Sequence, residues 1–188
     1  MVHVGYLTHF SHKNIITYSN RPFQSVEEMN GILIRNMNSV IKPDDILYHL
    51  GDWSVWYGKD FLQTAIDCRK AIFCKNIVLI SGNHDFKIGQ CPLFDALFSR
   101  RYDYFELKYQ NILFCMMHYR LAVRNKGHIK GASIGLHGHG HPTSRELIDG
   151  SLDCGIDSNN YFPLTIDDVI KIVREQDSEE IIDPKFNV

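Results

Sequence analysis

The stretch NIVLISGNHD, residues 76–85, joins an almost continuously apolar run to a polar turn. A short apolar run such as NIVLIS is typical of a strand that is covered on both faces of its sheet. Gly82 follows it and lets the backbone turn sharply. Asn83, His84 and Asp85 come directly after this glycine. Residues 76–85 therefore predict a buried strand that carries polar groups at its carboxyl end.

The same form recurs along the chain. Apolar runs lead into Thr8-His9, Gly51-Asp52, His118 and the segment His137–His141; they are VHVGYL, DILYHL, NILFCMM and ASIGL, with a further run SLDCGI near the end. Open α/β sheets gather their sites at the carboxyl ends of strands. We therefore expect these polar groups to lie in one place.

Three helices are predicted between the strands. Ser25-Val26-Glu27-Glu28 is a capping box that opens a helix ending near Lys42-Pro43, and a second helix covers 60–73. A third begins at Thr165, with Asp168 as its capping acid. Early strands alternate with helices and later strands follow one another, which predicts an α/β domain of two packed mixed sheets with helices outside.

The composition limits the classes of protein. The chain has 188 residues, of which 44% are hydrophobic and 22% charged, with a net charge of -2. This predicts a single domain over 1–176 with a polar tail over 177–188, and neither a membrane nor long nucleic acid as partner. The sequence carries no signal for an oligomeric state.

The cysteines point to a reducing compartment. There are five, an odd number, and none forms a C-x-x-C pair. This argues against a disulfide framework and against a structural zinc site. The chain also shows no signal peptide and no apolar run long enough for a membrane helix, so we expect a cytoplasmic protein.

The polar groups at the strand ends form a candidate metal-ligand set: His9, Asp52, Asn83, His118, His139 and His141. Oxygen and imidazole donors together suit Mn, Fe, Ni, Co or Zn and would be poor for calcium. One aspartate can bridge two ions, and an asparagine oxygen can complete one shell. Two such ions activate a water and stabilise an in-line displacement at phosphorus.

In this order the motifs resemble the calcineurin-like metallophosphoesterase family, whose pattern is D-x-H, G-D, G-N-H-[DE], H and G-H-x-H. The resemblance runs from about residue 5 to 162, and the last four blocks are intact. The stretches THFSHKNI, NRPFQSVEEMN and KPDDILYHLGD resemble a compact bacterial and phage-type branch. The resemblance implies a four-layer α/β/β/α sandwich.

The resemblance also implies residue roles. It gives the first ion to His9 and His141, the second to Asn83, His118 and His139, and has Asp52 bridge both. It implies that His84 faces the substrate and assists the leaving oxygen, oriented by Asp85, while a hydroxide between the ions attacks phosphorus.

One position departs from the family pattern. Leu7 stands where the family has an aspartate that binds the first ion, so this site should be weakened. Three interpretations remain open: His12, Thr8 or a water fills the vacancy; the protein works with one tight and one exchangeable ion; or the chain is an inactivated variant.

Other residues have a functional and a structural interpretation. Arg120 follows His118 closely and could bind phosphate at the rim, or lie in a solvated loop; Trp53 and Trp56 could stack on a nucleobase or cover the core. The remaining polar residues near the motifs favour structural roles: His49, His137, Asp153 and Asp157.

Two functions follow. The first is a metal-dependent phosphoesterase that hydrolyses small phosphodiesters or phosphomonoesters of a nucleotide-like kind. The second is an inactivated or non-catalytic metal-binding protein on the same fold, motivated by Leu7. The pair His84–Asp85 favours the enzyme, because a degenerate chain has no reason to keep a histidine that binds no metal.

Overall fold

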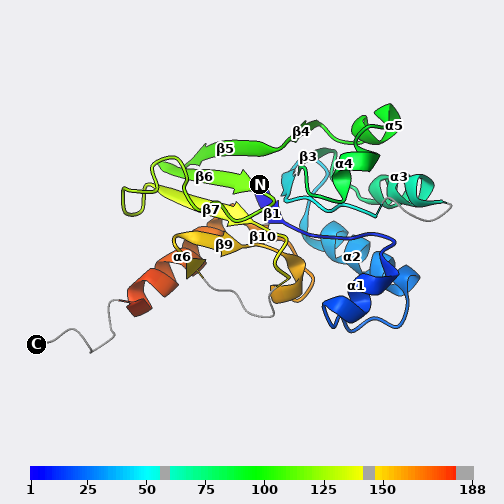
Figure 1. Ribbon diagram of the computed structural model, residues 1–188, viewed down its shortest axis with the longest axis horizontal. Coiled ribbons are helices and arrows are strands. Elements are labelled where there is room, and N and C mark those ends of the chain that lie inside the picture. Colours follow the sequence, from blue (N-terminus) through cyan, green and yellow to red (C-terminus); the bar gives the residue numbers. More distant parts are fainter. Residues whose placement is uncertain (56–59, 142–146, 181–188) are drawn as a thin grey trace, which may run out of the picture.

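The computed structural model describes residues 1–55, 60–141 and 147–180, and its first sheet has five strands in the order β10-β1-β2-β3-β4 (Figure 1). Their bounds are β1 Val2–Gly5, β2 Ile46–His49, β3 Asn76–Ile80, β4 Arg100–Tyr102 and β10 Leu164–Thr165. The strands β1 to β4 are parallel, and β10 runs antiparallel to β1. The carboxyl ends of β1, β2 and β3 therefore lie at one edge.

The chain passes into the second sheet between β4 and β5, at Asp103. This sheet has the order β5-β6-β7-β9-β8, with bounds β5 Tyr104–Tyr109, β6 Ile112–Met117, β7 Ser133–His137, β8 Leu147–Ile148 and β9 Ser151–Asp153. The central strands β6, β7 and β9 are parallel, and the outer strands are antiparallel to their neighbours. Both sheets are mixed, as predicted.

The helices are α1 Lys13–Tyr18, α2 Val26–Val40, α3 Phe61–Ala71, α4 Asp85–Ile88, α5 Pro92–Asp95 and α6 Ile166–Glu180, with the 3-10 turn η1 Ile156–Ser158. Both predicted caps are present. The Ser25 hydroxyl accepts the Glu28 N–H at 3.1 Å, and the Thr165 hydroxyl accepts the Asp168 N–H at 3.0 Å. Because α6 continues to Glu180, the predicted tail from residue 177 begins inside this helix.

Two apolar cores hold the layers together. One lies between the first sheet and the helices α2 and α3, with Leu33, Leu47 and Ile77 among its buried side chains. The other joins the two sheets and α6 and includes Tyr48 and Phe114. Two mixed sheets flanked by helices confirm the predicted α/β sandwich.

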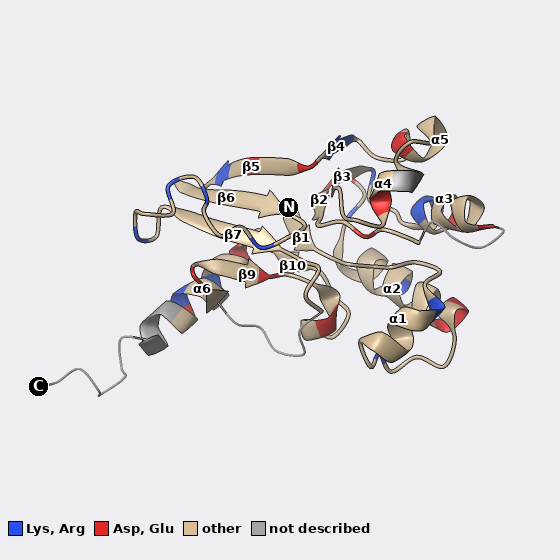
Figure 2. Cartoon of the chain, in the orientation of Figure 1, with Lys and Arg blue, Asp and Glu red and all other residues tan. Residues whose placement is uncertain are grey.

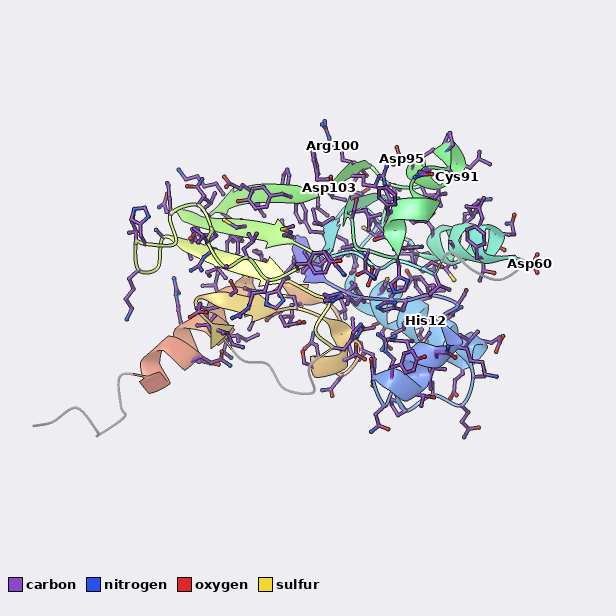
Figure 3. All side chains as sticks on the ribbon, in the orientation of Figure 1. His12, Asp60, Cys91, Asp95, Arg100 and Asp103 are labelled. Carbon is purple, nitrogen blue, oxygen red and sulfur yellow. The ribbon has the colours of Figure 1, made fainter. Side chains whose placement is uncertain are left out.

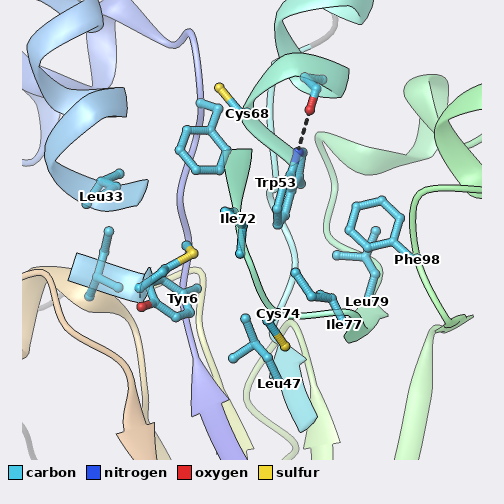
Figure 4. Close-up of a cluster of buried hydrophobic side chains, with 14 of the residues drawn as sticks. Tyr6, Leu33, Leu47, Trp53, Cys68, Ile72, Cys74, Ile77, Leu79 and Phe98 are labelled. Carbon is cyan, nitrogen blue, oxygen red and sulfur yellow. Dashed lines mark hydrogen bonds between the residues drawn. The ribbon is translucent and has the colours of Figure 1, made fainter. Parts of the chain in front are cut away.

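Trp53 belongs to the first core. Its ring is fully buried against Phe98, and its Nε1–H donates to the Ala65 carbonyl at 3.3 Å (Figure 4). This burial decides for the structural interpretation of Trp53, because a covered ring cannot stack on a ligand. Trp56 lies outside the described residues.

Charged residues of both signs are interspersed along the helices and strands (Figure 2). No helix in the described part of the chain has the length and apolar character that a membrane crossing requires.

Candidate metal centre

The predicted ligands come from strand ends of both sheets. His9 follows β1, Asp52 follows β2 and Asn83 follows β3, all at the carboxyl edge of the first sheet. His118 directly follows β6, and both His139 and His141 follow β7 in the second sheet. The packing of the two sheets brings all six side chains into one connected cluster.

One group of donors surrounds His118, which the resemblance gives to the second ion. Its Nε2 lies 3.1 Å from Asn83 Oδ1, 3.1 Å from His139 Nδ1 and 3.4 Å from Asp52 Oδ2. Its Nδ1 lies 2.8 Å from the Leu50 carbonyl. A carbonyl accepts but never donates, so Nδ1 carries the proton and the Nε2 lone pair faces the other donors.

The other group surrounds Nε2 of His9, which the resemblance gives to the first ion. This nitrogen lies 3.1 Å from His141 Nε2 and 3.5 Å from Asp52 Oδ2. His141 in turn places its Nδ1 at 2.7 Å from Asp157 Oδ2. Nε2 of His141 is therefore the nitrogen that is left to face His9.

Asp52 connects the two groups through one atom. Its Oδ2 lies within 3.5 Å of ring nitrogens of both His9 and His118, while its Oδ1 accepts the backbone N–H of His84 at 2.9 Å. The carboxylate is buried. Its orientation is held by the His84 amide, and the free oxygen lies between the two sets of imidazoles.

The backbone at this cluster is unusual. His9, Asp52, His139 and His141 have φ values of 49°, 53°, 67° and 47°. Residues other than glycine seldom adopt this left-handed conformation, and such strain concentrates at functional sites. Two of these turns are joined by a hydrogen bond, in which the His9 N–H donates to the Asp52 carbonyl at 2.9 Å.

Leu7 does not face open space. Its side chain is fully buried, and a Cβ added to Gly138 would collide with its Cδ1. Thr8 is turned away from the cluster, since its hydroxyl donates to the Trp53 carbonyl at 2.7 Å and lies 3.2 Å from His49 Nε2. Thr8 therefore does not join the donors around Nε2 of His9.

His12 also meets His9, but at the other ring nitrogen. The two Nδ1 atoms lie 3.4 Å apart, whereas the Nε2 of His9 faces Asp52 and His141. His12 lies at the end of the molecule that holds α1 and α2 (Figure 3). It therefore meets His9 at Nδ1, on the side of the ring away from Asp52 and His141.

The structure corrects the role given to Asp85. Its carboxylate accepts three backbone N–H groups, those of Asp52, Trp53 and Gly82, at 2.7, 2.9 and 2.9 Å. Nδ1 of His84 is buried without a hydrogen-bond partner. Asp85 thus orders the loop that carries Asp52 and does not orient the His84 ring.

Electrostatics favour the neutral form of three imidazoles in the cluster, those of His9, His12 and His118. Burial lowers the pKa of His9 well below its usual value, and His141 and Arg21 lower it further. Burial also lowers the pKa of His118, against the opposing effect of Asp52. Burial and the neighbouring His84 lower the pKa of His12 to about 4. Neutral imidazole is the form that binds metals.

The donors fit a divalent ion. Asp52, His118 and His139 each offer a ligand atom within 4.8 Å of the others. In the described part of the chain the same is true of His9, His12 and His84. Metal–nitrogen and metal–oxygen bonds of about 2.0–2.2 Å require donors this close together. A mixed oxygen and imidazole set suits the borderline metals.

Other predicted residues lie at the margin. Arg120 is 45% exposed, and its Nη1 lies 3.3 Å from Asp149 Oδ2, so it is turned toward the β8–β9 turn. His49 is a buried core residue, in agreement with the sequence. His137 Nδ1 lies 3.1 Å from the Gly138 carbonyl and 3.5 Å from Asp153 Oδ2, outside both donor groups.

Tyr119 and Asp157 lie beside the site, and the sequence did not predict these contacts. The Tyr119 hydroxyl donates to Asn83 Oδ1 at 3.3 Å, and its ring lies against His118 and His139. Its place next to His118 in the chain was the available signal. Nothing in the spacing of Asp157 indicated its contact with His141.

Comparisons with known proteins found similarity both in sequence and in fold. No family model matches the sequence. The protein MJ1445 of Methanocaldococcus jannaschii, named as uncharacterized, is 31% identical over 179 residues, or 89% of this chain and 88% of that protein. The crystal structure of AQ665 from Aquifex aeolicus, a protein of unknown function, covers 92% of this chain and 98% of its own, with a TM-score of 0.72 and 23% identity. This likeness shows a shared fold.

A second solved structure, of an archaeal phosphodiesterase, covers 82% of this chain and 81% of its own, with a TM-score of 0.46 and 15% identity. A likeness of that degree is too weak to bear on function.

Proposed function

The chain belongs to the same family as MJ1445 of Methanocaldococcus jannaschii, and we propose that it is a metal-dependent phosphoesterase. The observation that carries this proposal is the position of Asp52 Oδ2, within 3.5 Å of Nε2 atoms from both His9 and His118. One carboxylate oxygen between two sets of imidazoles is the arrangement that a pair of ions requires. The resemblance of the motifs to the calcineurin-like metallophosphoesterases supports the same reaction.

We assign two ions to unequal sites. The second ion is held by Asp52, Asn83, His118 and His139, and a weaker first ion by His9, Asp52 and His141. The donors suit Mn, Fe, Ni, Co or Zn. When bound, such ions activate water for attack on phosphorus and neutralise charge on the phosphoryl oxygens.

His84 is the proposed catalytic residue that binds no metal. Its backbone N–H holds Asp52, and its ring lies edge-on to His9 with the ring centroids 5.1 Å apart. The side chain is half-buried beside the exposed Asn83. From this position the imidazole can donate a proton to a leaving oxygen.

The proposed substrate is a small phosphate ester, a diester or monoester of a nucleotide-like kind. The exposed side of the cluster is formed by Asn83, His139 and Tyr119, with Arg120 near the rim. The Tyr119 ring, 43% exposed, offers a face for a planar leaving group. Long nucleic acid is not proposed, because charges of both signs are interspersed and the net charge is -2.

A cytoplasmic setting belongs to the proposal. None of the five cysteines forms a disulfide, and four of them are buried. Thiols that form no disulfides are typical of a reducing compartment.

The test is hydrolysis of bis-p-nitrophenyl phosphate and p-nitrophenyl phosphate by metal-stripped protein resupplied with Mn²⁺, Ni²⁺, Co²⁺, Mg²⁺ or Zn²⁺. The proposal expects turnover that returns with metal and is lower by a factor on the order of 10²–10⁴ in a His84→Ala preparation purified in parallel. Equal turnover in both preparations would reveal a contaminating hydrolase.

A non-catalytic metal-binding protein is the second candidate. The packing of Leu7 against Gly138 favours it, because this contact leaves the first site without the carboxylate expected there. This candidate expects tight binding of one ion and no hydrolysis of either ester under any metal.

A further inference from the structure

Beneath the first site lies a buried ion pair that the proposed chemistry does not use. Arg21 Nε donates to Asp157 Oδ1 at 2.7 Å, and its Nη2 donates to Asp157 Oδ2 at 3.0 Å. The two side chains are 0% and 4% exposed. A bidentate pair of this kind fixes both the position and the orientation of the carboxylate.

The guanidinium is anchored on its other side as well. Its Nη1 donates to the Thr8 carbonyl at 3.0 Å, and its Nη2 donates to the Leu7 carbonyl at 2.9 Å. Arg21 thus ties the η1 turn, which carries Asp157, to the segment between β1 and His9. Arg21 therefore joins the segment that delivers His9 to the carboxylate that contacts His141.

The same carboxylate meets His141. Its Oδ2 lies 2.7 Å from Nδ1 of that imidazole, on the side of the ring away from His9. A carboxylate held by Arg21 is an acceptor, so His141 must be the donor, which places its proton on Nδ1. Nε2 of His141 then presents a lone pair toward His9 Nε2, 3.1 Å away.

A carboxylate behind a metal-binding imidazole has two effects. It holds the ring in one tautomer and one orientation, and it makes the ligand nitrogen more basic. His118 has a neutral counterpart of this contact, since its Nδ1 faces the Leu50 carbonyl at 2.8 Å. The first site therefore has a charged support and the second site a neutral one.

We propose that Asp157, anchored by Arg21, is a positioning residue that fixes the Nδ1–H tautomer of His141 and so directs its Nε2 at the first ion. At this site Asp157 adds a carboxylate behind His141 to the ligand carboxylate of Asp52, where Leu7 supplies none. This inference rests on the proposed function only in assuming an ion at His9, Asp52 and His141.

The alternative is an ion pair that only stabilises the fold. Burying two charges is costly, and a buried pair is weak evidence for stability by itself. A purely structural pair would affect unfolding but leave the tautomer of His141 and the affinity for metal unchanged. These two readouts separate the explanations.

The test compares Asp157→Asn with a matched control, Asp153→Asn. Asp153 is also buried near the same loop, but its Oδ1 accepts the Gly155 N–H at 2.8 Å and it faces His137, which lies outside both donor groups. Each variant keeps the size of the side chain and removes one charge. Both variants are prepared metal-free with ¹⁵N-labelled histidine.

The first measurement is the tautomer of His141 from long-range ¹H–¹⁵N spectra, its signals assigned by their loss in His141→Gln. In the wild type and in Asp153→Asn we expect a single form protonated at Nδ1. In Asp157→Asn we expect a mixture of tautomers, because an amide can donate as well as accept.

The second measurement is calorimetric titration with Mn²⁺. We expect the weaker ion to bind about 10–100-fold less tightly in Asp157→Asn, the usual effect of removing an outer partner. The tighter ion should change by less than about twofold, and Asp157→Glu should restore part of the loss. An unchanged tautomer, or an unchanged affinity for the weaker ion, overturns the inference.

If Asp157→Asn does not fold, Arg21→Lys tests the same inference. Lysine keeps the positive charge but cannot make the bidentate contact with Asp157. The inference expects a smaller shift of the same two readouts, and no shift overturns it. Neither measurement involves a phosphate ester, so the hydrolysis assay can fail while this result holds, and the reverse.

Discussion

Leu7 packs against Gly138, so the side chain at the position expected to bind the first ion instead supports the turn that carries His139. A methyl group on Gly138 would collide with Cδ1 of Leu7. Gly138 is kept small by this neighbour and not by its backbone, because it is absent from the residues with a positive φ. The leucine and the glycine form one packing unit.

This contact predicts strong coupling between two substitutions. Gly138→Ala should lower the free energy of unfolding by about 1–3 kcal/mol, the usual cost of overpacking. Leu7→Ala alone should cost about 2–5 kcal/mol through the cavity that it leaves. The double variant should cost at least about 1 kcal/mol less than the sum, because the new methyl group enters that cavity. Urea denaturation of metal-free protein measures all three, and strictly additive values would show that the two residues do not touch.

His84→Ala should separate metal binding from turnover. The substitution keeps the backbone N–H that donates to Asp52 Oδ1, so the bridging carboxylate stays in place. Turnover should fall by a factor on the order of 10²–10⁴, the range for a positioned acid–base group. Metal content measured by mass spectrometry should stay near that of the wild type, and His137→Ala serves as the matched histidine control. Loss of metal in parallel with activity would make His84 a ligand.

Asp52→Asn should weaken both ions at once. The asparagine can still accept the His84 N–H through its own oxygen, so the loop should remain ordered, but the charged oxygen between His9 and His118 is lost. Equilibrium dialysis against Mn²⁺ should show fewer than two ions per chain under conditions that saturate the wild type. The control Asp153→Asn removes a buried charge whose carboxylate faces His137, which is not among the donors, and should retain both ions. If Asp52→Asn still holds two ions, Asp52 does not bridge them.

The clustering of these ligands could be predicted from sequence because the signal is local. Each apolar run ends in a polar turn, and packed sheets bring the carboxyl ends of strands such as β2, β3 and β6 together. The strand β5, YFELKY, escaped prediction because its side chains are mostly half-buried, which blurs the alternation of apolar and polar residues. The short helices α4 and α5 give too few residues for a helical period.

The partners of individual carboxylates could not be predicted. Asp85 stands next to His84 in the sequence, yet its oxygens reach backbone groups that lie 32 and 33 residues away as well as the nearby Gly82. Asp157 contacts Arg21 across 136 residues. The order of residues indicates which side chains reach the same edge of a sheet. It does not indicate which donor each carboxylate oxygen meets there.

The stability of the metal-free protein should depend on pH through His49. This histidine is completely buried, and burial lowers its pKa to about 3, helped by the nearby His118. In the unfolded chain its pKa is about 6.5, so below that pH the unfolded state takes up a proton that the folded state refuses. The folded state therefore loses about 1.4 kcal/mol per pH unit as the pH falls from about 6.5 toward 3.

His49→Phe should remove this loss, since phenylalanine keeps a ring against Tyr6 and Trp53 but cannot be protonated. Between pH 6 and pH 4, the variant should gain about 2–3 kcal/mol relative to the wild type in urea denaturation with a chelator present. Parallel stability curves over this range would mean that His49 takes up its proton in the folded state as readily as in the unfolded state.

Leu7→Asp should exchange stability of the metal-free fold for affinity at the first site. Position 7 is fully buried, so a carboxylate there is desolvated and, without a cation, its charge is uncompensated. The metal-free variant should therefore unfold at a lower urea concentration than the wild type.

A divalent ion reverses the balance, because the new carboxylate adds both charge and an oxygen donor to a site that has only His9, His141 and Asp52. We expect the weaker ion to bind at least about tenfold more tightly, the lower end of what even an outer partner contributes. The temperature of thermal unfolding should then rise more steeply with Mn²⁺ concentration than in the wild type, since a ligand stabilises the state that it binds.

Leu7→Asn is the matched control, because asparagine has the shape of aspartate without its charge. If calorimetry gives the same affinity for the weaker ion in the wild type, the asparagine and the aspartate variants, position 7 does not face that ion and its leucine is a packing residue alone.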